Sequence, residues 1–316
     1  MAEELFKGEN EYADQAGTGK LLNPRIDSTF KALFTQKTKE SEDALKSFLS
    51  AAIERRVMGC TVTANDAPIE YAGQRGVSYD IACELDDGTV ADVEMQAFNQ
   101  KYDYGRRAEY QVARLEATYF KKGSPWEKVP TVYQISILDF DYRVDGVESD
   151  VKDAEADPVV SRFAMRTRDG RELANALNVI FVELPKALRL EGSLDSNTDL
   201  ENWAIFLKDA DNPEKKDIID RLTSKEEGLM QAQKSLSSIS NNRDLWIAQF
   251  RQDVYETDRI SGLEAARNEG RETGLKDGRK EQAFTTARSM MVDGLPIEKI
   301  VQYTGLTVDD IRSLVS

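Results

Sequence analysis

The chain has 316 residues, and 57 Asp and Glu against 42 Lys and Arg give it a formal net charge of −15. It contains no histidine, which excludes Ser-His-Asp and Cys-His nucleophile systems and His-liganded zinc sites. Any chemistry must therefore use carboxylates, amines, hydroxyls or a metal bound by carboxylates. The acidic balance argues against nonspecific coating of nucleic acid, but it leaves room for a local basic patch.

Cysteine content and the length of apolar runs indicate the cellular compartment of the protein. The two cysteines, Cys60 and Cys83, are too few for a disulfide scaffold or a zinc site, so we expect reduced thiols. The longest apolar runs, such as 179–182, are far shorter than the roughly 20 residues that cross a bilayer. The first residues are acidic where a secretory signal would be positive. We expect a cytoplasmic protein with no membrane partner.

The first two thirds of the chain mix helical and strand patterns. Residues 1–20 are polar and contain glycine, which predicts a flexible leader. Residues 21–190 are predicted to form an α/β domain, in which Asp27 begins the first helix and a second helix covers 106–120. Runs rich in β-branched residues predict strands at 61–63, 77–85, 89–98, 129–138, 163–166 and 177–184.

After residue 190 the strand signals cease, and residues 191–260 are predicted to be a helical extension. In 261–282, glycines 262, 270, 274 and 278 fall along one helical stripe. Two interpretations stay open for this stripe: a helix that packs closely on another helix, for example in a homodimer, or a flexible connector.

Residues 283–316 are predicted to form a small helical unit that resembles a helix-turn-helix. Gly305 marks its turn, and the segment from Thr307 to Asp310 is a capping box. Asp309 and Asp310 open the presumed recognition helix, where their negative charges would repel DNA phosphates. DNA reading and a structural or oligomerising role both remain open for this unit.

The most informative segment is a predicted hairpin, 77–98. A three-residue loop, Asp86-Asp87-Gly88, would pair Asp80 with Glu94 and place both on one face with Asp92 and Gln96. Facing carboxylates repel unless a cation lies between them, and Mg²⁺ or Mn²⁺ suits oxygen ligands. A two-residue turn would separate the pair, and a half-solvated sheet commonly carries acids on its wet face without any metal.

Six ordered features carry a resemblance that covers roughly residues 20–316. Five of them are Asp27–Phe34, Tyr79–Ile81, Val93–Gln96, Arg106–Tyr110 and Phe181–Lys186, and the C-terminal glycine stripe with its small helical unit is the sixth. Together they resemble the recombination-promoting nuclease / putative transposase family of the PD-(D/E)xK nuclease superfamily. The resemblance implies a restriction-endonuclease-like mixed sheet flanked by helices, followed by an all-α C-terminal region. It also implies a metal-dependent DNA endonuclease, a hydrolase linked to recombination, transposition or mobile elements.

By the same resemblance, Asp80 and Glu94 would hold a divalent metal, Mg²⁺ foremost with Mn²⁺ or Ca²⁺ as alternatives, and Asp27 would add a further ligand. The catalytic set would be Asp80, Glu94 and Gln96. The superfamily usually has lysine where this chain has Gln96, a side chain that cannot be a base or carry charge. The positive charge toward phosphate and DNA is then expected from residues just downstream, which are Lys101, Arg106 and Arg107.

Two further hypotheses belong beside the nuclease. Gln96 and the acidity of the chain suit a non-catalytic nucleic-acid-binding or regulatory protein that keeps the nuclease fold. The glycine stripe suits homodimers formed through the helical C-terminal region. Glu183 and Lys186 are expected to form a structural ion pair.

Overall fold

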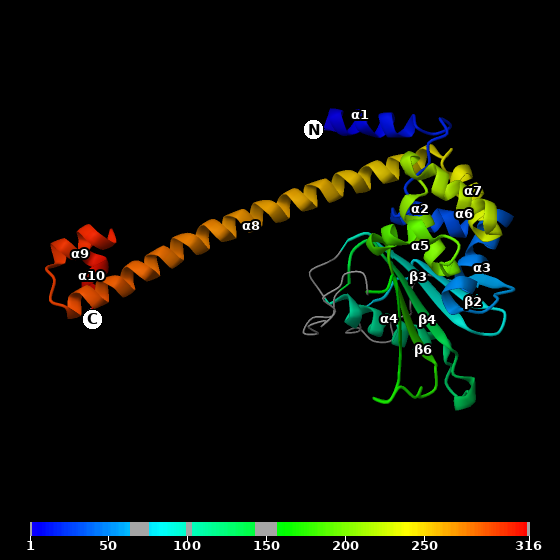
Figure 1. Cartoon of the computed structure of the whole chain (residues 1–316), viewed down its shortest axis with the longest axis horizontal. Coiled ribbons are helices and arrows are strands. Elements are labelled where there is room, and N and C mark those ends of the chain that lie inside the picture. Colours follow the sequence, from blue (N-terminus) through cyan, green and yellow to red (C-terminus); the bar gives the residue numbers. More distant parts are fainter. Residues whose placement is uncertain (1, 64–75, 99–102, 143–156, 315–316) are drawn as a thin grey trace. The chain divides into compact units, whose positions relative to one another are not determined.

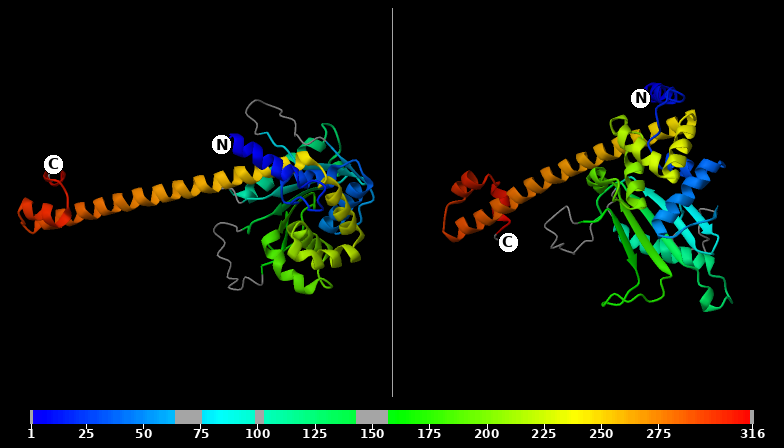
Figure 2. Two further views of the ribbon diagram at one scale, coloured as in Figure 1. Left: turned by 90° about the horizontal axis from the view of Figure 1, so that it is seen from above. Right: turned by 45° about the vertical axis from the view of Figure 1, so that its right-hand side comes forward.

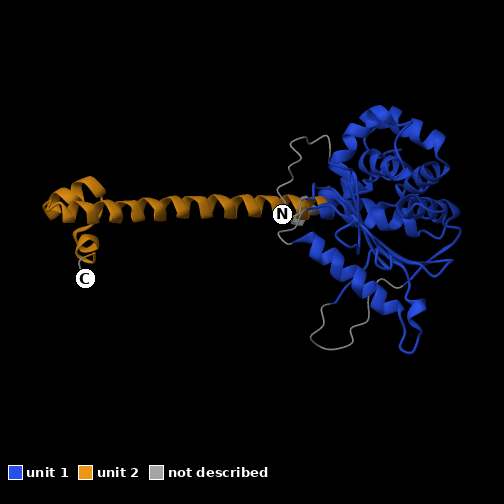
Figure 3. Cartoon of the chain, turned by 60° about the horizontal axis from the view of Figure 1, so that its bottom comes forward, with its two compact units in different colours: residues 1–252 blue, residues 253–316 orange. Residues whose placement is uncertain are grey.

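The structure is a computed structural model that describes residues 2–63, 76–98, 103–142 and 157–314. The chain divides into two compact units, Met1–Gln252 and Asp253–Ser316 (Figure 3). Within the described ranges, no helix has the length and apolar character needed to cross a membrane.

The first unit is built on a mixed six-stranded sheet with the order β1-β2-β3-β4-β6-β5 (Figure 1). Its strands are β1 (Cys60–Val62), β2 (Ile81–Leu85), β3 (Val90–Gln96), β4 (Val132–Leu138), β5 (Val160–Ala164) and β6 (Leu177–Glu183). β3, β4 and β6 run parallel, and the outer pairs are antiparallel. The predicted α/β domain with a mixed sheet is therefore confirmed.

The β2–β3 hairpin has the predicted loop and register. Ile81 pairs with Val93, and the amide of Leu85 donates to the carbonyl of Thr89 across a loop of three residues. Gly88 has φ +82°, a left-handed conformation that glycine adopts without steric cost. Because side chains alternate, the register brings Asp80, just before β2, opposite Glu94 on β3.

Helices cover both faces of the sheet. On one face lies α4 (Tyr104–Tyr119), which packs on β3, β4 and β6 and forms an apolar cluster with them. On the other face lie α2 (Asp27–Thr35) and α3 (Lys39–Ile53), backed by α5 (Asp199–Asp209), α6 (Lys216–Lys225) and α7 (Glu227–Ile239) (Figures 1 and 2). The alternative of a half-solvated acidic face does not hold, because α4 covers that face and leaves Asp92 0% and Glu94 1% exposed.

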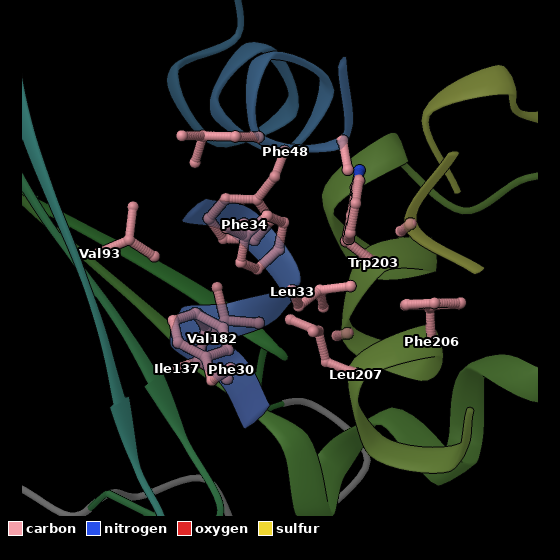
Figure 4. Close-up of a cluster of buried hydrophobic side chains, with 14 of the residues drawn as sticks. Phe30, Leu33, Phe34, Phe48, Val93, Ile137, Val182, Trp203, Phe206 and Leu207 are labelled. Atoms are coloured by element: carbon pink, nitrogen blue, oxygen red, sulfur yellow. The ribbon is translucent and has the colours of Figure 1, made fainter. Parts of the chain in front are cut away.

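The larger core fills the space between the sheet and these helices. Figure 4 shows Phe30 and Phe34 of α2 between sheet residues such as Val182 and the side chain of Trp203 on α5. The rings of Phe34 and Trp203 are 5.8 Å apart, and both side chains are buried. This packing fixes α2, and so it fixes the position of Asp27 and its neighbours on the exposed side of that helix.

The leader predicted as flexible contains a helix, α1 (Ala2–Ala13). Tyr12 of α1 packs on Phe250, with ring centroids 5.0 Å apart, and Ala13 is buried. The prediction missed this helix because its many charges and the glycine at position 8 suggested a polar leader, whereas a short helix of this kind depends on tertiary contacts for its stability.

The remaining helices are α8 (Arg243–Val292), α9 (Ile297–Thr304) and α10 (Val308–Arg312). The four glycines at 262, 270, 274 and 278 lie inside α8, so this segment is a helix and not a connector. Among the described atoms, nothing comes within 4 Å of a methyl group built on any of the four. Thr307 and Asp310 form the predicted capping box, and the finer domain boundaries at 190, 260 and 282 stay predictions.

Candidate active site

The candidate site lies where the three parallel strands end. Gln96, Leu138 and Glu183 are aligned at the carboxyl ends of β3, β4 and β6. In open α/β sheets this edge is where ligands bind, because loops diverge there and leave room for them. Glu94, two residues before the end of β3, projects toward α4, while Asp80 enters the sheet at the same edge from β2.

Four polar side chains surround the carboxylate of Glu94. Gln111 donates to Oε1, while Arg107 Nη2 lies 3.4 Å, Gln96 Nε2 3.3 Å and Tyr104 Oη 3.5 Å from Oε2. Three of these partners come from α4, because Tyr104, Arg107 and Gln111 are spaced three and four residues apart and share one helix face. The buried acid is therefore held by the helix that covers it.

Asp80 has a different set of partners. Its Oδ2 accepts a hydrogen bond from the amide of Met95 at 3.1 Å, and its Oδ1 lies 3.0 Å from Nζ of Lys31 on α2. The same ammonium lies 3.1 Å from Asp27, one turn earlier on that helix. Lys31 thus links the two acids that the sequence proposed as ligands, Asp27 and Asp80.

The protonation of these groups follows from burial and mutual charge. Burial raises the pKa of Glu94 to about 7; the Arg107 guanidinium opposes that rise, and the Asp80 charge adds to it. Burial also raises the pKa of Asp80, with the Asp27 charge adding to it, and the Lys31 ammonium only partly offsets this. Burial tends to lower the pKa of Lys31, but the Asp80 and Asp27 carboxylates outweigh it and raise that pKa. Burial is therefore the main reason why both carboxylates hold their protons more tightly than free side chains do.

A second acid, Asp92, is buried under α4 on the same face of β3. The carboxylate is fully buried beside Gln134, and the Gln134 side chain and the Ile81 amide lower its pKa only in part. Burial, together with the charges of Glu94 and Asp80, raises the pKa of Asp92 well above its usual value. Asp92 therefore adds to the cost of placing a further negative charge at this edge.

The predicted cations have different surroundings. Arg107 enters the site, where it contacts Glu94 and also donates to Oε1 of Gln96 at 3.4 Å. Arg106 projects to solvent with 85% of its side chain exposed and pairs with Asp103 at 3.2 Å. Lys101 lies outside the described residues. Of the two described cations, Arg107 is therefore the one that lies beside the acids.

The structure adds four residues to those predicted for the site, which are Lys31, Tyr104, Gln111 and Ser136, and Oγ of Ser136 lies 3.1 Å from Oη of Tyr104. The spacing of Tyr104, Arg107 and Gln111 indicated that they share one helix face, and the four-residue spacing of Asp27 and Lys31 indicated the same for that pair.

Glu183 and Lys186 form the expected structural ion pair at 2.8 Å, and Glu183 also accepts a hydrogen bond from the amide of Tyr142.

The donor set suits a hard divalent cation. Among the described residues no group of three or more Asp, Glu, Cys or His is arranged to hold a metal. Mg²⁺, however, is usually bound by one or two carboxylates together with waters and substrate phosphates. Asp80 and Glu94 provide two carboxylates at one edge of the sheet, and the charge of Asp80 raises the pKa of Glu94, so these residues fit such an ion.

Comparison with known proteins identifies the family. The family model described as PD-(D/E)XK nuclease family transposase matches residues 24–266. Neither the curated proteins nor the solved structures compared with the chain give a match. The matched segment contains the mixed sheet, the helices on both faces and the acids at the carboxyl edge of β3. The chain therefore belongs to the PD-(D/E)XK nuclease family transposases.

Proposed function

We propose that the protein is a metal-dependent DNA endonuclease that hydrolyses phosphodiester bonds. The observation that carries the proposal is the pairing of Asp80 with Glu94 at the carboxyl edge, flanked by the cationic side chains of Arg107 and Lys31. Family membership supports a nuclease-like activity. The site residues, the metal and the DNA substrate are our assignment.

Asp80 and Glu94 would hold the ion, which is Mg²⁺ in our proposal, with Mn²⁺ or Ca²⁺ as alternatives. When bound, such an ion polarises a phosphate oxygen and lowers the pKa of a coordinated water. Asp27, which shares Lys31 with Asp80, stays a proposed additional ligand. Gln96 orients Glu94 and Arg107, because its amide donates to the first and accepts from the second.

The chain's own side chains also prepare the site for a phosphate. Arg107 is one third exposed, so its guanidinium can contact a phosphate oxygen as well as Glu94. Arg106, on the solvent side of α4, and Lys101 are proposed to follow the DNA backbone, where contacts fix position but not sequence. In the hydrolysis, a water oxygen bonds to phosphorus while one P–O ester bond breaks. The water's proton passes to solvent, and the departing alkoxide is protonated.

One observation favours a second function, that of a non-catalytic nucleic-acid-binding protein. Both oxygens of Glu94 already accept hydrogen bonds, so a metal must displace Arg107, Gln96 or Tyr104 from Oε2, or share that oxygen with them. A permanently engaged Glu94 would bind no metal. The two functions predict opposite outcomes in a cleavage assay.

The test is nicking of supercoiled plasmid by the full chain in Mg²⁺, Mn²⁺, Ca²⁺ or EDTA. We expect metal-dependent cutting that falls by at least about 100-fold in Glu94→Gln and Asp80→Asn, because each variant removes a ligand charge. Asp87→Asn, at the opposite end of the same hairpin, is the matched control and should cut normally. Metal-independent DNA binding without cutting would favour the non-catalytic function, and unchanged cutting by Glu94→Gln would refute the site.

We also propose that two copies associate through the helical C-terminal region, as cutting both DNA strands with two-fold symmetry requires. The exposed glycine stripe of α8 supports this homodimer. A role in recombination or transposition and a cytoplasmic location complete the proposal. The free thiols of Cys60 and Cys83 are in keeping with a reducing compartment.

A further inference from the structure

Lys31 occupies an unusual position for a surface lysine. Its ammonium lies between two carboxylates from different elements, at 3.1 Å from Asp27 on α2 and 3.0 Å from Asp80 before β2. The side chain is 35% exposed, so solvent and a ligand can reach it. α2 cannot shift easily, because Phe30, Leu33 and Phe34 on its other face are buried in the core (Figure 4).

The ammonium has capacity left for a ligand. It carries three N–H donors, and among the described residues its ion-pair partners are the two carboxylates. Both oxygens of Asp27 lie 3.1 Å from the ammonium and Oδ1 of Asp80 lies 3.0 Å from it. A ligand oxygen can therefore replace one of the two Asp27 oxygens without breaking either ion pair. Because Lys31 and the proposed metal would share Asp80, a phosphate bound there by the metal would lie beside this ammonium.

Two described cations, Lys31 and Arg107, form ion pairs with the paired acids Asp80 and Glu94. Gln96 is uncharged, and Arg107 is directed to Glu94 and Gln96 on the α4 side of the sheet. Lys31 approaches the carboxyl edge from the opposite face, where α2 packs. The acids are thus flanked by one cation from each face, and Lys31 is the one that belongs to Asp80.

We propose that Lys31 is a catalytic residue that contacts the scissile phosphate and stabilises the negative charge that develops as the P–O bond breaks. The inference rests on the proposed nuclease function. Lys31 acts as a hydrogen-bond donor and keeps its proton throughout. Fixed donors of this kind contribute most in the transition state, because they need no reorientation as charge develops.

The test compares Lys31→Met, Lys31→Arg and wild type in plasmid cleavage, with kcat and KM determined separately in Mn²⁺. We expect kcat to fall by at least about 100-fold in Lys31→Met, as for the loss of a single charge-stabilising donor, and to recover at least about tenfold in Lys31→Arg. Mn²⁺ binding, measured by isothermal titration, should be as tight as in wild type or tighter, because a neighbouring positive charge is gone.

Lys46→Met is the matched control. Lys46 also pairs with two carboxylates, at 3.2 Å from Glu42 and 2.9 Å from Asp43, but on α3. This variant should cut like wild type, and thermal unfolding should show all variants folded. A smaller loss of kcat in Lys31→Met would overturn the inference, and so would a loss that weaker Mn²⁺ binding accounts for.

The two proposals fail in different ways. If wild type cuts in a Glu94-dependent manner while Lys31→Met keeps its kcat, only the role of Lys31 falls. If wild type does not cut with any metal, the nuclease proposal falls, and the role of Lys31 falls with it. Should Lys31→Met unfold, Lys31→Gln provides the same loss of charge with a polar side chain, and the same criteria apply.

Discussion

Glu94 is a buried carboxylate that four hydrogen-bond donors hold in place at the end of a strand. Its pKa is nonetheless raised, because burial outweighs the Arg107 guanidinium and the charge of Asp80 adds to the rise. The ionised form of such a group is less stable in the folded protein than in water. A bound cation would relieve that cost, which links the stability of the site to its proposed ligand.

This state of Glu94 predicts how stability depends on pH. In EDTA, folded Glu94 keeps its proton up to about pH 7, whereas the unfolded chain releases it near 4.5, so unfolding is favoured as the pH rises between them. The free energy of unfolding of wild type relative to Glu94→Gln should fall by on the order of 3 kcal/mol across this window. Urea denaturation at a series of pH values measures the difference.

The control for this experiment is Asp87→Asn. The Arg55 guanidinium, which donates to Asp87, holds the pKa of that carboxyl well below its usual range. The free energy of unfolding of wild type relative to Asp87→Asn should therefore stay constant from pH 4.5 to 7. If the free energies of unfolding of wild type and Glu94→Gln change in parallel with pH, the raised pKa of Glu94 is contradicted.

At the scale of elements, two helices build the site from opposite faces of the sheet. α4 supplies Tyr104, Arg107 and Gln111 to Glu94, and α2 supplies Lys31 to Asp80. The positions of both helices depend on packing behind them. For α2 that support includes α3 and α7, which pack on it and on each other.

The contact between α3 and α7 gives a prediction at this scale. Gly228 of α7 lies so close to α3 that a methyl group there would overlap Cβ and Oγ of Ser47. Gly228→Ala should lower the free energy of unfolding by about 1–3 kcal/mol, the usual cost of overpacking. Thermal or urea unfolding measures this change.

A double-mutant cycle tests whether the cause is this contact. Adding Ser47→Gly to Gly228→Ala removes the overlapping atoms and should recover part of the loss. Gly192→Ala, where no atom lies within 4 Å of the added methyl group, is the control and should change stability little. Additive effects of the two substitutions would refute the overlap as the cause.

On the scale of the whole molecule, the chain consists of two compact units with different architectures, one an α/β sheet domain and the other helical. The second unit has its own small core around Ala287, Ile300, Leu306 and Ile311. Each glycine of α8 lowers helix propensity by about 1 kcal/mol relative to alanine. Among the described atoms, nothing would contact a methyl group built on any of the four, so the stripe is costly for the helix unless another surface packs on it.

The proposed homodimer gives the prediction at this scale. If a second copy packs on the stripe, Gly274→Ala adds a methyl group to the interface, and we expect it to weaken self-association by about tenfold. Thr273→Ala, next to it but off the stripe, should leave association unchanged. Analytical ultracentrifugation of the full chain measures both. A variant that gains helicity by circular dichroism and associates like wild type would refute the stripe as an interface.

The sequence determined those features that depend on local chemistry. The sequence predicted the hairpin, with a three-residue loop Asp86-Asp87-Gly88 or a two-residue turn as the alternatives. The structure has the three-residue loop with Gly88 at positive φ, and its pairing places Asp80 opposite Glu94. The capping box at Thr307 is equally local. The mixed sheet followed from the strand and helix periods, and the ordered motifs identified the family.

Tertiary structure alone decided how the acids are surrounded. The alternating acids of β3 give the same sequence pattern whether that face of the sheet is exposed to solvent or covered by a helix. The burial of Asp92 and Glu94 therefore depended on where α4 packs. Arg106 and Arg107 are adjacent in sequence, but the rotation of α4 turns one to solvent and the other to Glu94. The link between Lys31 and Asp80 joins residues 49 positions apart. Such contacts arise from the packing of distant elements, and no local pattern encodes them.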